Sequence, residues 1–111
     1  MLASSLSVSV GTEVRLTLHI TNAADRPIEL RFPSGQTHDF AILDASRTEV
    51  WRWSAERLFT QAIQTRALGV GESATYEERW TPGNTAGAFT AVGKLASTNL
   101  PIEKRVEFTL P

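Results

Sequence analysis

Hydrophobic and polar residues alternate one by one along much of the chain. In residues 6–10 leucine and valine alternate with serine, and residues 14–20 repeat the pattern with charged and polar partners. A period of two places one row of side chains on a core and the other in water, so both stretches are predicted to be β-strands. Gly11 and Thr12 lie between the two rows and predict a turn or bulge.

Further short stretches of the same kind follow. Strands are expected at residues 28–32, around 40–42, at 49–54, around 65–68, and at 74–80, 89–95 and 106–110. Runs of Gly, Pro, Asn and Asp separate them. In the return strand Glu49–Ser54, Trp51 and Trp53 are expected to share one face. Residues 55–64 are the least strand-like, and Ala55–Phe59 could form a single helical turn.

About eight or nine short strands with frequent turns are typical of a sandwich or barrel. No stretch has the sustained helical period that a β/α fold requires. The pattern therefore predicts an all-β, immunoglobulin-like antiparallel β-sandwich. At 111 residues the chain is expected to form one domain, residues 1–111.

The absence of cysteine narrows the possible chemistry. Disulfides, thiolate nucleophiles and cysteine-based zinc sites are excluded, and a chain of this length can bury a core without them. No segment approaches the roughly 20 apolar residues that span a bilayer, and the first ten residues lack a basic opening. We expect a cytoplasmic location, or an extracytoplasmic one if the natural precursor carries a leader.

The charges are balanced, with a formal net charge of -1 and no run of one sign. Nucleic-acid binding would need a basic stripe, and binding to an anionic membrane would need a polybasic segment. Neither nucleic acid nor a membrane is therefore expected as a partner. The pattern does not predict an oligomeric state.

Candidate catalytic groups are few. His38 adjoins Asp39 and lies four residues after Ser34, which suggests a nucleophile with a base, but the Gly-x-Ser-x-Gly elbow of serine hydrolases is absent. No set of His, Asp or Glu has a metal-ligand spacing. We therefore predict no catalytic residue, metal, cofactor or small-molecule substrate, and expect the chain to bind another protein.

A series of distinctive motifs extends over nearly the whole chain. It consists of residues 22–25, Pro27-Ile28-x-Leu30-x-Phe32-Pro33-Ser34-Gly35-Gln36, Asp39-Phe40, Asp44, Val50-Trp51-Arg52-Trp53-Ser54, Phe59-Thr60-Gln61-Ala62, Leu68, Gly71-Glu72-Ser73, Tyr76, Trp80 and Phe89. In residue type and order these motifs resemble the intracellular proteinase inhibitor family typified by BsuPI. One departure is the turn at Asp44–Arg47, where the family commonly has a glycine. The resemblance implies an immunoglobulin-like sandwich that inhibits an intracellular serine protease.

A specific hypothesis for binding follows from the loops. We expect residues 33–38 and 57–64 to lie at one end of the sandwich and to face a subtilisin-like protease. Leu58-Phe59 would suit an apolar primary pocket, and residues 60–64 would pair with the enzyme as a strand. The predicted partner-binding residues are Pro33, Ser34, Gly35, Gln36, Arg57, Leu58, Phe59, Thr60 and Gln61. The alternative is a protein-interaction or adhesion module without inhibitory activity.

Overall fold

A computed structural model describes residues 1–111 as nine strands in three antiparallel sheets. The four-stranded sheet has the order β5 (Glu49–Arg52), β4 (His38–Leu43), β8 (Gly87–Leu95) and β9 (Ile102–Leu110). The three-stranded sheet has the order β1 (Leu2–Val10), β2 (Val14–Asn22) and β7 (Ser73–Trp80). The third sheet pairs β3 (Ile28–Phe32) with β6 (Gln64–Leu68). This architecture confirms the predicted all-β sandwich.

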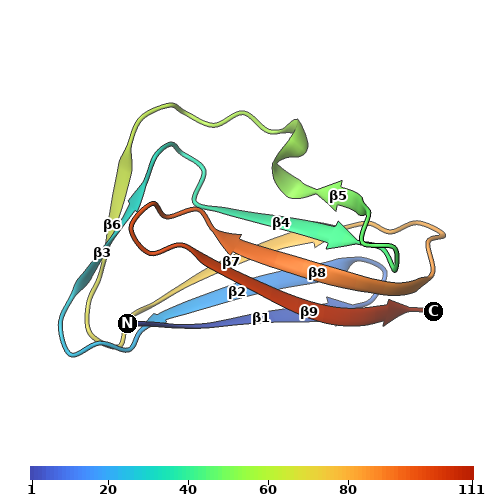
Figure 1. The fold of residues 1–111 in the computed structure, drawn as a ribbon, viewed down its shortest axis with the longest axis horizontal. Coiled ribbons are helices and arrows are strands. Elements are labelled where there is room, and N and C mark those ends of the chain that lie inside the picture. Colours follow the sequence, from blue (N-terminus) through green and yellow to red (C-terminus); the bar gives the residue numbers. More distant parts are fainter.

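The two larger sheets lie face to face, and the short β3–β6 ladder lies at one end, steeply inclined to them (Figure 1). The apolar rows of the alternating strands fill the space between them, as the period of two requires. The buried core consists of Leu6, Val14, Leu16, Leu18, Ile20, Leu30, Phe32, Phe40, Ile42, Leu68, Ala74, Trp80, Phe89, Ala91, Leu95 and Leu110.

The β3–β6 ladder is a bent continuation of the β2–β7 ladder, and Asn22 occupies the corner. The β2–β7 register ends at Thr21 opposite Ser73, and the β3–β6 register begins at Ile28 opposite Leu68. The Asn22 side chain is 1% exposed and donates hydrogen bonds to the carbonyl oxygens of Arg26 (2.9 Å), Leu68 (3.0 Å) and Gly69 (3.2 Å). One side chain thus joins the end of β2 to the turn before β3 and to the end of β6.

The return strand of the hairpin is shorter than predicted. The pairing with β4 ends at Arg52, and Trp53–Glu56 form a 3₁₀ turn, η1, instead of continuing the strand to Ser54. The prediction failed because the carboxylate of Asp39 binds the N–H of Ser54 (3.1 Å), which therefore does not extend the β-ladder. The predicted helical turn at 55–59 was likewise placed a few residues too late.

The turn before β5 contains the one non-glycine residue with positive φ, Arg47 at 66°. Asp44 builds this turn, because its Oδ1 atom accepts the N–H groups of Ser46 and Thr48, both at 2.9 Å. The left-handed conformation costs an L-residue about 1–2 kcal/mol, and glycine avoids that cost. This is the turn in which the sequence departs from the family that it resembles.

Replacing Arg47 with glycine should stabilise the protein. We expect Arg47→Gly to raise the free energy of unfolding by about 0.5–1 kcal/mol, since relief of strain outweighs the added flexibility of the unfolded chain. Thermal unfolding should then move up by about 4 °C. Ser46→Gly, one residue earlier and without positive φ, should have the opposite sign. A lower melting temperature for Arg47→Gly would contradict this account.

Candidate functional site

The longest connection in the fold is the stretch Arg57–Ile63 between η1 and β6, called here the η1–β6 segment. It runs as an extended strap along the upper edge of the molecule in Figure 1. Every side chain in it is exposed except that of Phe59, which is partly buried. Leu58 is 100% exposed and Ile63 is 78% exposed. The fully exposed Leu58 and the partly buried Phe59 are neighbours, so the segment holds these two apolar side chains in different ways.

The main chain of the segment is almost free of internal hydrogen bonds. Between residues 58 and 63 a single main-chain group bonds to another main-chain group, the carbonyl of Thr60, which accepts the N–H of Gly35 at 2.8 Å. Glycine suits this close approach, because a Cβ atom at position 35 would lie 2.5 Å from the hydroxyl oxygen and 3.2 Å from the main-chain nitrogen of Thr60, and Thr60 would have to shift. The neighbouring N–H and C=O groups stay available to an extended partner chain.

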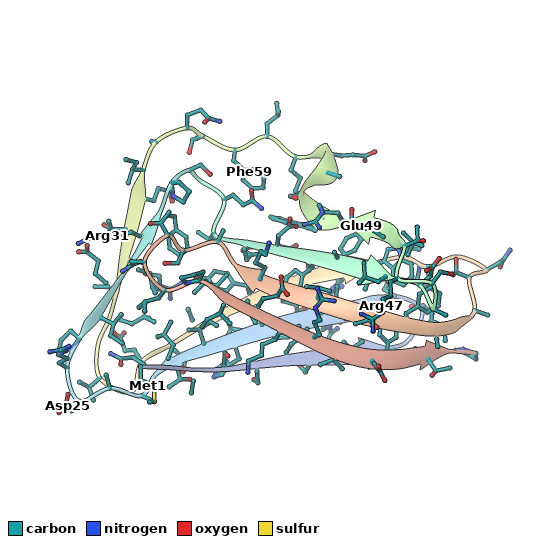
Figure 2. The ribbon with its side chains drawn as sticks, viewed as in Figure 1. Met1, Asp25, Arg31, Arg47, Glu49 and Phe59 are labelled. Atoms are coloured by element: carbon teal, nitrogen blue, oxygen red, sulfur yellow. The ribbon has the colours of Figure 1, made fainter.

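Trp53 supports the segment from below. The guanidinium carbon of Arg57 lies 4.5 Å from the centre of the Trp53 ring, and its Nε donates to the Trp53 carbonyl at 3.2 Å. The Phe59 ring packs on the same indole with a centroid distance of 5.7 Å and a 53° tilt. Figure 2 shows Phe59 pointing from the segment toward the body of the molecule. The residues on both sides of Leu58 are therefore fixed to one aromatic ring.

The indole of Trp53 rests in turn on His38. The two rings stack at 4.5 Å and 22°, and Tyr76 of β7 covers the opposite face of the imidazole at 4.8 Å and 28°. His38 Nε2 lies 2.8 Å from a carboxylate oxygen of Glu78, and Nδ1 lies 2.8 Å from the hydroxyl of Thr37. These contacts fix the imidazole in place. The stacked rings of Trp53, His38 and Tyr76 therefore connect the η1–β6 segment to β7 in the opposite sheet.

A buried carboxylate holds the start of η1. Asp39 is 6% exposed, and its oxygens accept the hydroxyl of Ser54 at 2.6 Å, the guanidinium of Arg52 at 2.8 Å and the N–H of Phe40 at 2.9 Å. Arg52 also donates to Glu49, at 3.0 Å from Nε. Charge-assisted bonds of this kind are shorter and stronger than neutral ones. The chain is thereby fixed one residue to either side of Trp53.

The pKa of Arg52 is raised above its ordinary value. The hydrogen bonds to Glu49 and then to Asp39 are the main causes, and they outweigh the opposing effect of partial burial. Arg52 thus remains a cation throughout the pH range in which the protein is folded. The ion pairs that hold η1 on β4 persist as long as the two carboxylates are ionised.

The structure brings the two predicted binding loops together, but in different roles. Gly35 contacts Thr60, whereas Pro33 is exposed and contributes no hydrogen bond. Ser34 accepts the N–H of Gln36 at 3.1 Å, and the Gln36 amide donates to the carbonyl of His38 at 3.1 Å. Residues 33–36 therefore form a turn beside the η1–β6 segment, whose side chains are exposed except that of Phe59.

The hypothesis of a nucleophile and base at Ser34 and His38 finds no support in the hydrogen bonds. The Ser34 hydroxyl binds Gln36, and both ring nitrogens of His38 are engaged elsewhere. The Thr37 hydroxyl occupies the place next to the imidazole, with Glu78 on the far side. Because both faces of the imidazole are covered by aromatic rings, we interpret this chain of hydrogen bonds as one that orients the ring.

The contribution of Asp39 was not predicted from the sequence, where this residue was considered as the neighbour of His38. A signal for it was present in the hairpin. The register of β4 and β5 places Ala41 opposite Arg52, so a return strand carried two residues further would place Asp39 opposite Ser54. An acid facing an Arg-x-Ser motif across a hairpin predicts a hydrogen-bonded cluster. The stacking of His38 with Tyr76 has no such local signal, because β7 lies far along the chain.

The structure contains no group of three or more His, Cys, Asp or Glu side chains that could hold a metal ion. Its helical residues form one turn of four, so none of its helices is long enough to cross a membrane.

The fold is thus a β-sandwich with an extended, exposed connection between η1 and β6. Comparison with protein families gives the class: the model of the BsuPI family, described as intracellular proteinase inhibitor, matches residues 2–100. The chain belongs to this family, which confirms the resemblance seen in the sequence.

The chain was also compared with solved structures and with curated protein sequences. A crystal structure of a Bordetella pertussis protein provisionally designated ApaA is similar over 99% of this chain and 92% of that chain, with a TM-score of 0.56 and 19% identity. At this level of identity the similarity supports the fold alone. No curated protein sequence matches the chain.

Proposed function

We propose that this chain inhibits a serine protease of the subtilisin-like class by presenting the η1–β6 segment to the active-site cleft. Membership in a family of proteinase inhibitors supports a protease as the partner. The observation that carries the finer proposal is the full exposure of Leu58 between two anchored neighbours. The chain acts by binding and contributes no catalytic group or cofactor of its own.

Leu58 is the residue assigned to the primary specificity pocket. The Phe59 ring packs on Trp53 and would have to leave it to enter a pocket, whereas Leu58 touches nothing and needs no rearrangement. Fully burying a leucine contributes about 1.5–3 kcal/mol. An apolar primary pocket, as in subtilisin-like enzymes, is the partner chemistry that this side chain fits.

The main chain supports the same mode of binding. Within residues 58–63 the Thr60 carbonyl bonds to the Gly35 N–H and the Phe59 carbonyl accepts a long bond (3.5 Å) from the Gln61 side chain, so an enzyme can pair with the other N–H and C=O groups as with an extended substrate. The contacts at Trp53 and Gly35 order the segment before the enzyme arrives. A pre-ordered segment loses less conformational entropy on binding than a flexible one, which favours affinity.

Titration of a subtilisin-like protease with the purified chain tests the proposal. Residual activity on a chromogenic peptide should fall linearly to near zero at a defined molar ratio, because the complex is stoichiometric. The chain itself should remain largely intact on a denaturing gel. Rapid digestion of the chain, or activity unaffected by it, would instead favour the alternative of an interaction module without inhibitory activity.

A further inference from the structure

We propose that Trp53 is a positioning residue that keeps both ends of a cut Leu58–Phe59 bond in place, so that the bound protease rejoins them. This inference rests on the proposed function and adds to it a reason why the segment inhibits instead of being consumed. It concerns the contacts on either side of Leu58, whereas the proposed function concerns Leu58 itself.

The contacts of Trp53 straddle the bond in question. On the amino-terminal side, the Arg57 guanidinium lies over the indole and Arg57 Nε bonds to the Trp53 carbonyl. The Arg57 N–H also donates to the Ser54 carbonyl at 3.2 Å. On the carboxy-terminal side, the Phe59 ring packs on the same indole. A cut between residues 58 and 59 leaves each new end with its own contact to Trp53.

A second anchor holds the carboxy-terminal end. The Thr60 carbonyl accepts the Gly35 N–H, and Gly35 belongs to the β3–β4 turn, which a cut in the segment does not release. The new amino group on Phe59 is therefore tied at its own ring and at the next residue. Beyond it, β6 remains paired with β3 through five residue pairs, so the strand itself has no cause to leave.

The chemistry is that of reversible acyl transfer. The serine oxygen of the protease attacks the Leu58 carbonyl carbon, the C–N bond to Phe59 breaks, and the amine nitrogen of Phe59 takes the proton that the serine lost. In hydrolysis, water adds its OH to the acyl carbon and returns its proton to the serine. In rejoining, the Phe59 amine attacks the same carbon, the serine oxygen leaves, and the proton returns to it.

Whether the acyl-enzyme is hydrolysed or the Leu58–Phe59 bond is rejoined depends on the position of the Phe59 amine. Groups held in the right geometry react with effective molarities of ~10⁵ M or more, far above the concentration of water. An amine that Trp53 and Gly35 hold near the acyl carbon therefore competes with water. A free leaving strand would diffuse away, and the chain would behave as an ordinary substrate.

Phe59→Ala is the direct test, because it removes the aromatic contact of the leaving strand and leaves Leu58 unchanged. Trp53→Ala removes the contacts of both ends, and Trp53→Phe restores an aromatic ring. The Trp53→Phe control is well matched, since the indole N–H is buried and has no hydrogen-bond partner in the protein. Each variant is incubated with a catalytic amount of protease, and intact and nicked chains are followed by mass spectrometry.

For the native chain, incubations that start from intact or from isolated nicked protein should converge on the same mixture of both forms. Phe59→Ala and Trp53→Ala should be cut about 100-fold faster, and their nicked forms should not be rejoined. Trp53→Phe should behave like the native chain. The rejoining of nicked protein is a readout that a merely structural role of Trp53 would not predict.

The outcomes separate this inference from the proposed function. Native chain that is never nicked, nicked chain that is never rejoined, or Phe59→Ala that matches the native chain would overturn the role of Trp53, even if inhibition depends on Leu58. Inhibition that is indifferent to Leu58 would instead overturn the proposed function.

Discussion

Leu58→Asp is expected to weaken inhibition of a subtilisin-like protease by about 100-fold or more. The native leucine contributes about 1.5–3 kcal/mol on burial in an apolar pocket, and an unpaired carboxylate in the same pocket is unfavourable. Because Leu58 is fully exposed and touches nothing in the free chain, the melting temperature should not change. The inhibition constant, measured by competition with a peptide substrate, checks the prediction.

The matched control is Val70→Asp. Val70 is 59% exposed and lies in the turn between β6 and β7, away from the η1–β6 segment, so the same kind of change is made outside the proposed interface. Val70→Asp should leave the inhibition constant within about twofold of the native value, in keeping with the small effects of surface substitutions. Equal inhibition by native protein and Leu58→Asp would rule out residue 58 as the primary contact.

Asn22→Asp should be the most damaging conservative change in the fold, lowering the free energy of unfolding by about 4 kcal/mol. The native amide donates to three carbonyl oxygens at the corner between the β2–β7 and β3–β6 ladders. A carboxylate there would face those three oxygens with no proton to donate. Three carbonyl groups would lose their partner, and a charge would be buried without a counterion.

The pH dependence of this variant gives a second readout. Burial raises the pKa of the introduced carboxyl above its unfolded value of about 3.9. The folded state then binds the proton more tightly, so stability relative to the native protein is lost as pH rises from about 4 until the carboxyl ionises in the folded state.

Urea unfolding at several pH values measures this loss. Asn84→Asp, in the exposed turn between β7 and β8, is the control and should change stability by less than about 0.5 kcal/mol. A defect in Asn22→Asp that does not grow with pH would contradict the assigned hydrogen bonds.

The alternating pattern predicted most of the sandwich, because one buried face imposes a period of two on each strand. Residues 14–20 show this best, since every second side chain from Val14 to Ile20 is completely buried. The strand predicted around residues 65–68 is also confirmed, as β6, although most of its side chains are exposed. In β6 the residues Gln64–Ala67 are all exposed, and the strand exists because it pairs with β3.

The candidate site could be predicted only in outline. The exposed segment was identifiable as the stretch with the weakest strand pattern, and its residues 57–61 were named. The rings that pack beneath this segment could not be predicted, because His38, Trp53 and Tyr76 come from three elements that only the tertiary fold brings together. The hairpin prediction ran two residues too far since a side chain, Asp39, took a hydrogen bond that the pattern assigns to a strand.

The freedom of Leu58 has a consequence for how such a protein acquires new targets. Arg57, Phe59 and Thr60 make contacts that hold the segment on the fold, whereas the side chain of residue 58 makes none. In the proposed binding mode, a substitution there would change which protease is bound, without a loss of stability that other mutations would have to offset. A lysine at this position, for instance, would direct the same scaffold toward proteases that cleave after basic residues, so a single codon would suffice to change the target.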